Sequence, residues 1–264
     1  MTRLSSDLIF DVGLHHGDDA DFYLRKGFRV VALEANPEFC RRARERFATE
    51  IGEGRLAIVN KALDREAGRR ATFYLRADKD DWSSLDAEMA GRGGGALTEI
   101  QVETTTLGSL VEEHGVPYYL KVDIEGADEH AVEQLASLPT LPNYVSVEAS
   151  GDPLSTFVRC GYRSFQIVNQ GYLRLFPSPS PAREGKYAEQ HYDDHISGLF
   201  GRELDPSGWA DAATTARRLA KWRDLNDKRG NALVRRALKN FGKLTRRSWL
   251  IGTGWIDIHA RLDA

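Results

Sequence analysis

Cysteine is scarce in this chain, and the chain has no long apolar run and no strong net charge. The two cysteines, Cys40 and Cys160, lie far apart, which excludes a disulfide framework and favours a reducing compartment. No apolar run approaches membrane-spanning length. A formal net charge of −3 argues against a dedicated nucleic-acid binder. The first apolar run starts at Leu8, which leaves no room for a signal peptide, so we expect a cytoplasmic protein.

The 264 residues are enough for one large domain or for a domain with an elaborated end. The composition, 41% hydrophobic and 28% charged, is typical of a globular protein. Charge is unevenly distributed, because residues 227–248 contain eight Lys or Arg and one Asp. This basic segment is either a solvated helix face or a surface for an anionic substrate or membrane.

The stretch Leu8–Ala35 has the pattern of a βαβ nucleotide-binding unit. An apolar run leads to Gly13, a helix begins after Gly17, and a second apolar run ends at Glu34. An acid at the end of the second strand is placed to accept hydrogen bonds from both hydroxyls of a ribose ring. The residues of this unit that we expect to contact a cofactor are Asp11, Gly13, Gly17, Glu34 and Ala35.

The turn itself favours one class of nucleotide. A dinucleotide site has the pattern G-x-G-x-x-G, but here His15 and His16 occupy the middle of the turn. The next helix starts with Asp18 and Asp19, which would repel a phosphate. S-adenosylmethionine has no phosphate and carries a cationic sulfonium, so it fits this acidic turn better. A nicotinamide-dependent oxidoreductase is the alternative enzyme class.

Further cofactor contacts are expected beyond this unit. The third strand is predicted over Leu56–Leu63, with Asn60 and Ala62 lining the adenine or, equally, forming a polar strand-end turn. Strands are also predicted over Ala71–Arg76 and Glu99–Thr105. The long, glycine-rich loop between them is either a cofactor-covering lid or a plain solvent-exposed loop. It contains Ser83 and Ser84, whose hydroxyls suit the carboxylate of the methionine moiety.

Two later strands each deliver an acid at the carboxyl end. Tyr118–Ile124 leads to Asp123, a helix follows over Ala127–Leu138, and Asn143–Glu148 ends in Glu148. Because ligands bind at the carboxyl ends of strands in such sheets, the two acids are expected to converge on one crevice; the alternative is two strand-end acids that face solvent. Asp123 is therefore expected to contact the cofactor and, with Glu148, to serve catalysis.

Several of these segments together resemble the FkbM-type S-adenosylmethionine-dependent methyltransferases. They are DVGLHHGDDADFYL, VALEANP, VNKAL, the Trp82-Ser83-Ser84 loop and LKVDIEGADEHAVEQL. The resemblance implies a class I methyltransferase fold, which is a doubly wound, Rossmann-like and mostly parallel α/β sheet with an antiparallel last strand. It also implies O-methylation of a sugar or natural-product hydroxyl. The pair His15-His16 departs from the small or amide residues often found in this turn.

This fold gives an expected domain organisation. Residues 1–170 form the cofactor-binding core, 171–254 an insertion over the substrate crevice, and 255–264 the final strand, with Trp255–Ala260 alternating as a strand does. The expected partner is a small-molecule hydroxyl acceptor, with no nucleic acid and no integral membrane segment. A non-catalytic S-adenosylmethionine-binding module that docks a partner through its basic helix is a third hypothesis.

Methyl transfer to a hydroxyl needs a base, and three residues are candidates. They are Asp123, Glu148 and His195, of which His195 has the best matched ordinary pKa. The two acids would instead hold a hard divalent cation if a metal acidified the hydroxyl. The chain lacks a compact ligand motif such as H-E-x-x-H, so a metal-free mechanism is favoured and no metal ligand is predicted.

Overall fold

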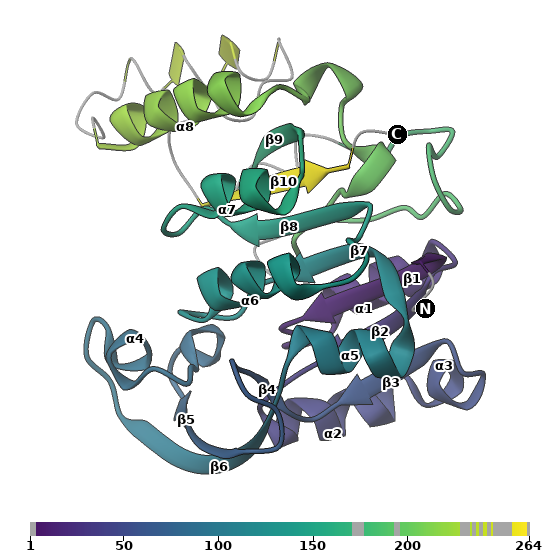
Figure 1. The fold of residues 1–264 in the computed structure, drawn as a ribbon, viewed down its shortest axis with the longest axis vertical. Coiled ribbons are helices and arrows are strands. Elements are labelled where there is room, and N and C mark those ends of the chain that lie inside the picture. Colours follow the sequence, from purple (N-terminus) through teal and green to yellow (C-terminus); the bar gives the residue numbers. More distant parts are fainter. Residues whose placement is uncertain are drawn as a thin grey trace. The chain divides into compact units, whose positions relative to one another are not determined.

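The computed structural model describes residues 4–170, 177–192, 196–227 and 255–262, with positions 233, 236–237, 240–241 and 244 between the last two ranges. The chain divides into two compact units, Met1–Asn143 and Tyr144–Ala264 (Figure 1). Each unit has buried apolar side chains of its own.

The first unit is built on four parallel strands in the order β3-β2-β1-β7. Every residue of β7 and the last five residues of β1 are buried. Continuous apolar runs of this kind are expected for parallel strands that are covered on both faces. The bounds of these strands are Leu4–Val12 for β1, Arg29–Leu33 for β2, Leu56–Val59 for β3 and Val116–Val122 for β7.

Helices connect these strands and pack against them. The start of α2 is set by Asn36, whose side chain accepts a hydrogen bond from the backbone N–H of Glu38, and by Pro37 at the first helical position. The predicted helix over 127–138 is shorter in the structure, because α6 ends at Gln134 and a 3₁₀ turn, η2 (Leu135–Ser137), follows. The helices are α1 (Asp18–Arg25), α2 (Pro37–Arg46), α3 (Ala48–Gly52), α5 (Leu107–His114) and α6 (Asp128–Gln134).

A second, three-stranded sheet has the order β4-β6-β5. The prediction of one strand over Leu56–Leu63 was wrong. β3 ends at Val59, and β4 (Ala62–Leu63) pairs with β6 (Leu97–Thr105) of the second sheet. The chain leaves the first sheet at Asn60, whose side-chain amide donates to the carbonyls of Glu34 and Ala35 at 2.9 and 3.1 Å.

The strands predicted over Ala71–Arg76 and Glu99–Thr105 are present as β5 (Arg70–Arg76) and β6, and the structure pairs them antiparallel. The long connection between them contains a 3₁₀ turn, η1 (Asp80–Trp82), and a short helix, α4 (Ala87–Gly91), which contacts β5 (Figure 1). The connection therefore contains two short helical elements.

In the second unit, β10 (Ile256–Arg261) lies between β8 (Tyr144–Glu148) and β9 (Ser164–Asn169) and is antiparallel to both. The fold is thus α/β and doubly wound, with the antiparallel last strand predicted over Trp255–Ala260. The other elements are α7 (Pro153–Cys160), the 3₁₀ turns η4 (Gly201–Glu203) and η5 (Pro206–Gly208), and α8 (Ala212–Asp227). Among the described helices, none has both the length and the apolar character needed to cross a membrane.

Candidate functional site

The β1–α1 turn requires glycine at two positions for steric reasons. Gly13 has a φ of 97°, and a Cβ there would overlap the carbonyl oxygen of Asp123. Its N–H donates to the carbonyl of Leu33 at 3.0 Å, which ties the turn to the end of β2. Gly17, with a φ of 84°, starts α1, and a Cβ there would lie 2.8 Å from the ring of Phe47. The two predicted glycines therefore bring the turn close to the ends of β2 and β7.

Glu34 lies at the end of β2 with 9% of its surface exposed. One carboxylate oxygen accepts from the N–H of Asn36 at 2.7 Å and the other from the N–H of His15 at 2.9 Å. Burial raises the pKa of Glu34, and these backbone hydrogen bonds oppose the increase. Each oxygen of an ionised carboxylate has two acceptor sites, so each retains one after these bonds.

Ala35 and Ala62, both predicted to contact a cofactor, are buried together in an apolar cluster with Phe73 and Val102. Asn60, between β3 and β4, is half-buried and fixes the backbone that follows Glu34. Ala35 and Ala62 are thus part of the buried apolar cluster, and Asn60 fixes the backbone at the end of β2.

A buried lysine connects the turn to β7. The Lys121 ammonium lies 3.2 Å from a carboxylate oxygen of Asp11, 3.2 Å from one of Asp19 and 3.5 Å from one of Asp123. It also donates a hydrogen bond of 3.1 Å to the carbonyl of Gly13. Asp11 and Lys121 are direct neighbours in the β1–β7 register, so the sheet itself creates the pair. The lysine holds the glycine turn in place.

Burial and charge act in opposite directions on these groups. Burial lowers the pKa of Lys121, but the three carboxylates outweigh it and raise that pKa well above its usual range. Burial raises the pKa of Asp11 to about 7; Lys121 opposes this rise, and Asp19 and Asp123 add to it. Asp11 is fully buried, whereas the side chain of Asp123 is 54% exposed. Of these acids, Asp123 is thus the one that faces solvent beside the turn.

Sequence reasoning missed this role of Lys121 and Asp19. Asp18 and Asp19 were interpreted together as acids at a helix start, but only Asp18 faces outward, where it accepts from Arg46 at 2.9 Å. Asp19 is buried and faces Lys121. The available signal was a lysine in the apolar run YYLKV, because a charge in a buried strand requires partners.

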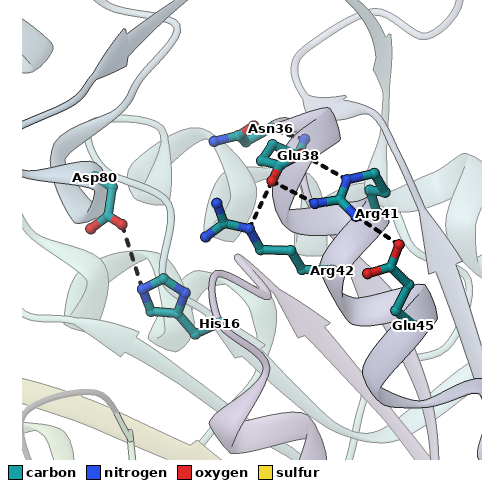
Figure 2. A network of polar contacts seen from close by, with 7 residues as sticks. All are labelled: His16, Asn36, Glu38, Arg41, Arg42, Glu45 and Asp80. Carbon is teal, nitrogen blue, oxygen red and sulfur yellow. Dashed lines mark hydrogen bonds and ion pairs between the residues drawn. The ribbon is translucent and has the colours of Figure 1, made fainter.

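His15 and His16 lie in the turn with their ring centroids 3.9 Å apart. The Nε2 atom of His15 is 3.3 Å from one oxygen of Asp80, and that of His16 is 3.5 Å from the other. Figure 2 shows the His16 contact with Asp80, which comes from η1 in the long connection. Burial and the neighbouring His16 lower the pKa of His15. The turn and the connection are therefore in contact at this point.

The connection also contacts the segment after β7. The Ser84 hydroxyl donates to the carbonyl of Glu125 at 2.5 Å, and the Arg92 guanidinium pairs with the Glu125 carboxylate at 2.8 Å. The Ser83 hydroxyl accepts from the N–H of Arg76 at 3.1 Å. Both serines hold the connection in place through these hydrogen bonds.

The three predicted catalytic residues have different positions in the chain. Asp123 follows β7 in the first unit, and its N–H donates to the carbonyl of Val12 at 2.9 Å. Glu148 ends β8 in the second unit, where it is half-buried and opposite Asp257 of β10. His195 lies outside the described residues. The expected convergence of Asp123 and Glu148 stays a prediction.

Comparisons with known proteins identify the family of this chain. This chain is similar to a solved structure of precorrin-6y C5,15-methyltransferase from Geobacter metallireducens. The superposition has a TM-score of 0.35 and a sequence identity of 12%, and it covers 62% of this chain and 67% of that chain. No curated protein matches the sequence. The model of the methyltransferase FkbM domain matches residues 11–173, which include the glycine turn, Glu34, the long connection and Lys121. This chain belongs to the FkbM methyltransferase family.

Proposed function

We propose that this protein is an S-adenosylmethionine-dependent O-methyltransferase that acts on a hydroxyl of a sugar or natural-product-like small molecule. The observation that carries the proposal is the environment of Glu34. Its buried carboxylate is oriented by the N–H groups of His15 and Asn36 and retains one acceptor site on each oxygen. Two acceptor sites beside a glycine turn suit the two hydroxyls of a ribose ring.

The other residues around the turn fit the same cofactor. Bound S-adenosylmethionine supplies a methyl group on a cationic sulfonium. Asp123, exposed beside the turn, gives the negative charge that suits a cation. Asp11 acts through Lys121, which holds the Gly13 carbonyl, and is a positioning residue in this proposal. The remaining proposed cofactor contacts are Gly17, Ala35, Asn60, Ala62 and Ser83.

A hydroxyl becomes an effective nucleophile when a base takes its proton. We assign this role to one of Asp123, Glu148 and His195, and a well-placed base contributes ~10²–10⁴-fold to the rate. Residues 1–170 form the cofactor-binding domain in this proposal, and residues 171–254 bind the acceptor. Positioning of hydroxyl and methyl supplies on the order of 7–11 kcal/mol.

The cofactor class is tested by titrating the protein with S-adenosylhomocysteine and with NAD⁺ in parallel, using isothermal calorimetry. The NAD⁺ arm is needed because Asp18 and Asp19 are ion-paired with Arg46 and Lys121, which reduces their repulsion of a phosphate. We expect binding of S-adenosylhomocysteine alone, since His15 occupies the middle of the turn. Binding of NAD⁺ alone would overturn the proposal.

The reaction is tested by methyl transfer to a panel of hydroxylated acceptors, measured for wild type and for His195→Ala, Asp123→Asn and Glu148→Gln. His191→Ala is the matched control, since His191 is an exposed histidine four residues from His195. If His195 is the base, activity rises with pH through about 6.5 and is lost in His195→Ala only. Full activity of His195→Ala would remove the histidine from the mechanism and leave the two acids.

A further inference from the structure

We propose that His15, His16 and Asp80 form a binding site for one divalent transition-metal ion of the zinc class. The proposal does not depend on the methyltransferase reaction. It starts from the three side chains that the β1–α1 turn and η1 bring together, from positions more than sixty residues apart in the sequence. One potential ligand atom from each of these three described side chains lies within 4.8 Å of the other two.

The distances match those of a metal site. Zinc binds imidazole nitrogen and carboxylate oxygen at about 2.0–2.1 Å, so two ligand atoms at a tetrahedral angle are roughly 3.3–3.4 Å apart. The Nε2 atoms of His15 and His16 lie 3.3 and 3.5 Å from the Asp80 oxygens. These two contacts are to different oxygens of Asp80, and all three ligand atoms lie within 4.8 Å of one another, so side-chain rotation would have to bring them onto one ion.

The surroundings hold the ligands from both sides. Phe39 packs its ring against both imidazoles, with centroid distances of 4.9 Å to His15 and 5.0 Å to His16. The N–H of His15 donates to Glu34, which fixes the backbone of the turn. In the long connection, Asp80 belongs to the same 3₁₀ turn as Trp82. The ammonium of Lys79 lies 3.7 Å from the centroid of the Trp82 ring.

The ligand set indicates the class of metal. Two imidazoles and one carboxylate suit zinc and neighbouring transition metals, whereas Mg²⁺ and Ca²⁺ prefer sites made of oxygen. Three protein ligands leave a fourth position open on a tetrahedral ion, and the Asp80 side chain is 47% exposed. A bound ion would also fasten the long connection to the β1–α1 turn, because Asp80 belongs to the first and both histidines to the second.

The test uses tag-free, metal-free protein, Zn²⁺ titration by calorimetry, and Co²⁺ as a spectroscopic probe. We expect one equivalent of Zn²⁺ to bind, a visible Co²⁺ band typical of four-coordination, and no competition from excess Mg²⁺. His16→Ala and Asp80→Asn should each weaken Zn²⁺ binding by more than the roughly 10–100-fold that loss of an outer-shell partner costs. Both side chains are partly exposed, so these variants should fold, which circular dichroism checks.

Two variants serve as matched controls. His130→Ala removes an exposed histidine that lies 3.5 Å from Glu133, and Asp81→Asn removes the exposed acid next to Asp80. Both should bind Zn²⁺ like wild type. Equal Zn²⁺ affinity of wild type and His16→Ala, or no binding by wild type at micromolar protein, would overturn the proposal.

Hydrogen exchange gives a readout that is independent of affinity. Zn²⁺ should slow amide exchange in residues 77–86 of wild type and leave it unchanged in Asp80→Asn. Binding of Zn²⁺ without slower exchange in this segment would exclude Asp80 as a ligand and so overturn the site as proposed. The measurements need neither cofactor nor acceptor, so a negative result leaves the methyltransferase proposal unaffected.

Discussion

Two groups of ion pairs in the first unit have comparable distances but very different surroundings. Around Lys121, the carboxylates of Asp11 and Asp19 lie at 3.2 Å, and the side chains of all three residues are at most 5% exposed. Around Glu38 on α2, the guanidinium groups of Arg41 and Arg42 lie at 2.8 Å (Figure 2). Those three side chains are 45–58% exposed.

The ion pairs of Glu38 are shorter than those of Lys121, but they are the weaker ones because water surrounds them. Hydrogen bonds from Arg41 and Arg42 lower the pKa of Glu38 to about 2, whereas burial raises that of Asp11 to about 7. An exposed ion pair loses little hydration when it forms and adds little to stability. A buried charged group has lost its hydration, so only its partners stabilise it. Burial, rather than distance, therefore decides which group of ion pairs the fold depends on. It is the buried group that holds the glycine turn of the candidate site.

The largest effect is expected from Lys121→Met, which leaves Asp11 and Asp19 buried without their cation. Removing one partner of a buried ion pair costs about 3–5 kcal/mol. Urea unfolding followed by circular dichroism should show a loss of this size. The triple variant Lys121→Met/Asp11→Ala/Asp19→Ala, which removes the three buried charges and leaves only the exposed Asp123, should recover a large part of it. A loss below about 1 kcal/mol in the single variant would mean that burial does not separate the two groups.

The next effect is a pH dependence that Asp11→Asn removes. The pKa of Asp11 is about 7 in the folded chain, above the ~3.9 of an unfolded aspartate, so the folded state retains a proton that the unfolded state has released. The resulting stability is complete below about pH 4 and is lost as the pH rises to about 7. The free energy of unfolding of wild type minus that of the variant should therefore fall by a few kcal/mol over this range.

Urea unfolding at pH values from 4 to 8 measures this difference. Asp7→Asn is the matched control: it is an exposed aspartate of the same strand, and its pKa is lowered, chiefly by a hydrogen bond from Arg29. The stability that Asp7 contributes is lost only as the pH falls below about 4, so its difference curve should be nearly flat over most of this range. Parallel curves for wild type and Asp11→Asn would contradict the assignment to Asp11.

A moderate effect is expected from Glu34→Gln, which tests the buried acid four residues before the exposed Glu38. Loss of hydrogen bonds to a charged group should weaken S-adenosylhomocysteine binding by ~1–3 kcal/mol. Calorimetry measures the affinity, and Glu45→Gln, an exposed acid of α2, should bind like wild type. Unchanged affinity of Glu34→Gln would mean that Glu34 is not the ribose acceptor.

The smallest effect is expected from Glu38→Gln. Its ion pairs with Arg41 and Arg42 are exposed and screened by salt, so the unfolding midpoint should move much less than for Lys121→Met. The remaining shift should decrease further between low and high salt. A shift as large as that of Lys121→Met would contradict the conclusion that the exposed ion pairs are weaker than the buried ones.

Much of the fold could be predicted from local pattern. The glycine turn, α1 and the two strands of the βαβ unit follow from the apolar runs and from Gly13 and Gly17, and the strands β5 and β6 lie where they were expected. The error at Leu56–Leu63 arose because all eight residues suit a strand. Which sheet they join depends on the Asn60 side chain and on the carbonyls of Glu34 and Ala35, which lie far away in the sequence.

Local sequence pattern is enough to predict the βαβ unit, the two glycines of its turn and the acid at the end of β2, because backbone preferences and apolar periodicity are properties of neighbouring residues. Tertiary contacts were needed to show that Asp19 turns inward to Lys121 while Asp18 faces Arg46, and that Asp80 lies beside His15 and His16. These outcomes depend on burial and on distances between residues far apart in the chain. Desolvation and Coulomb energy are set by those quantities, which no local pattern contains.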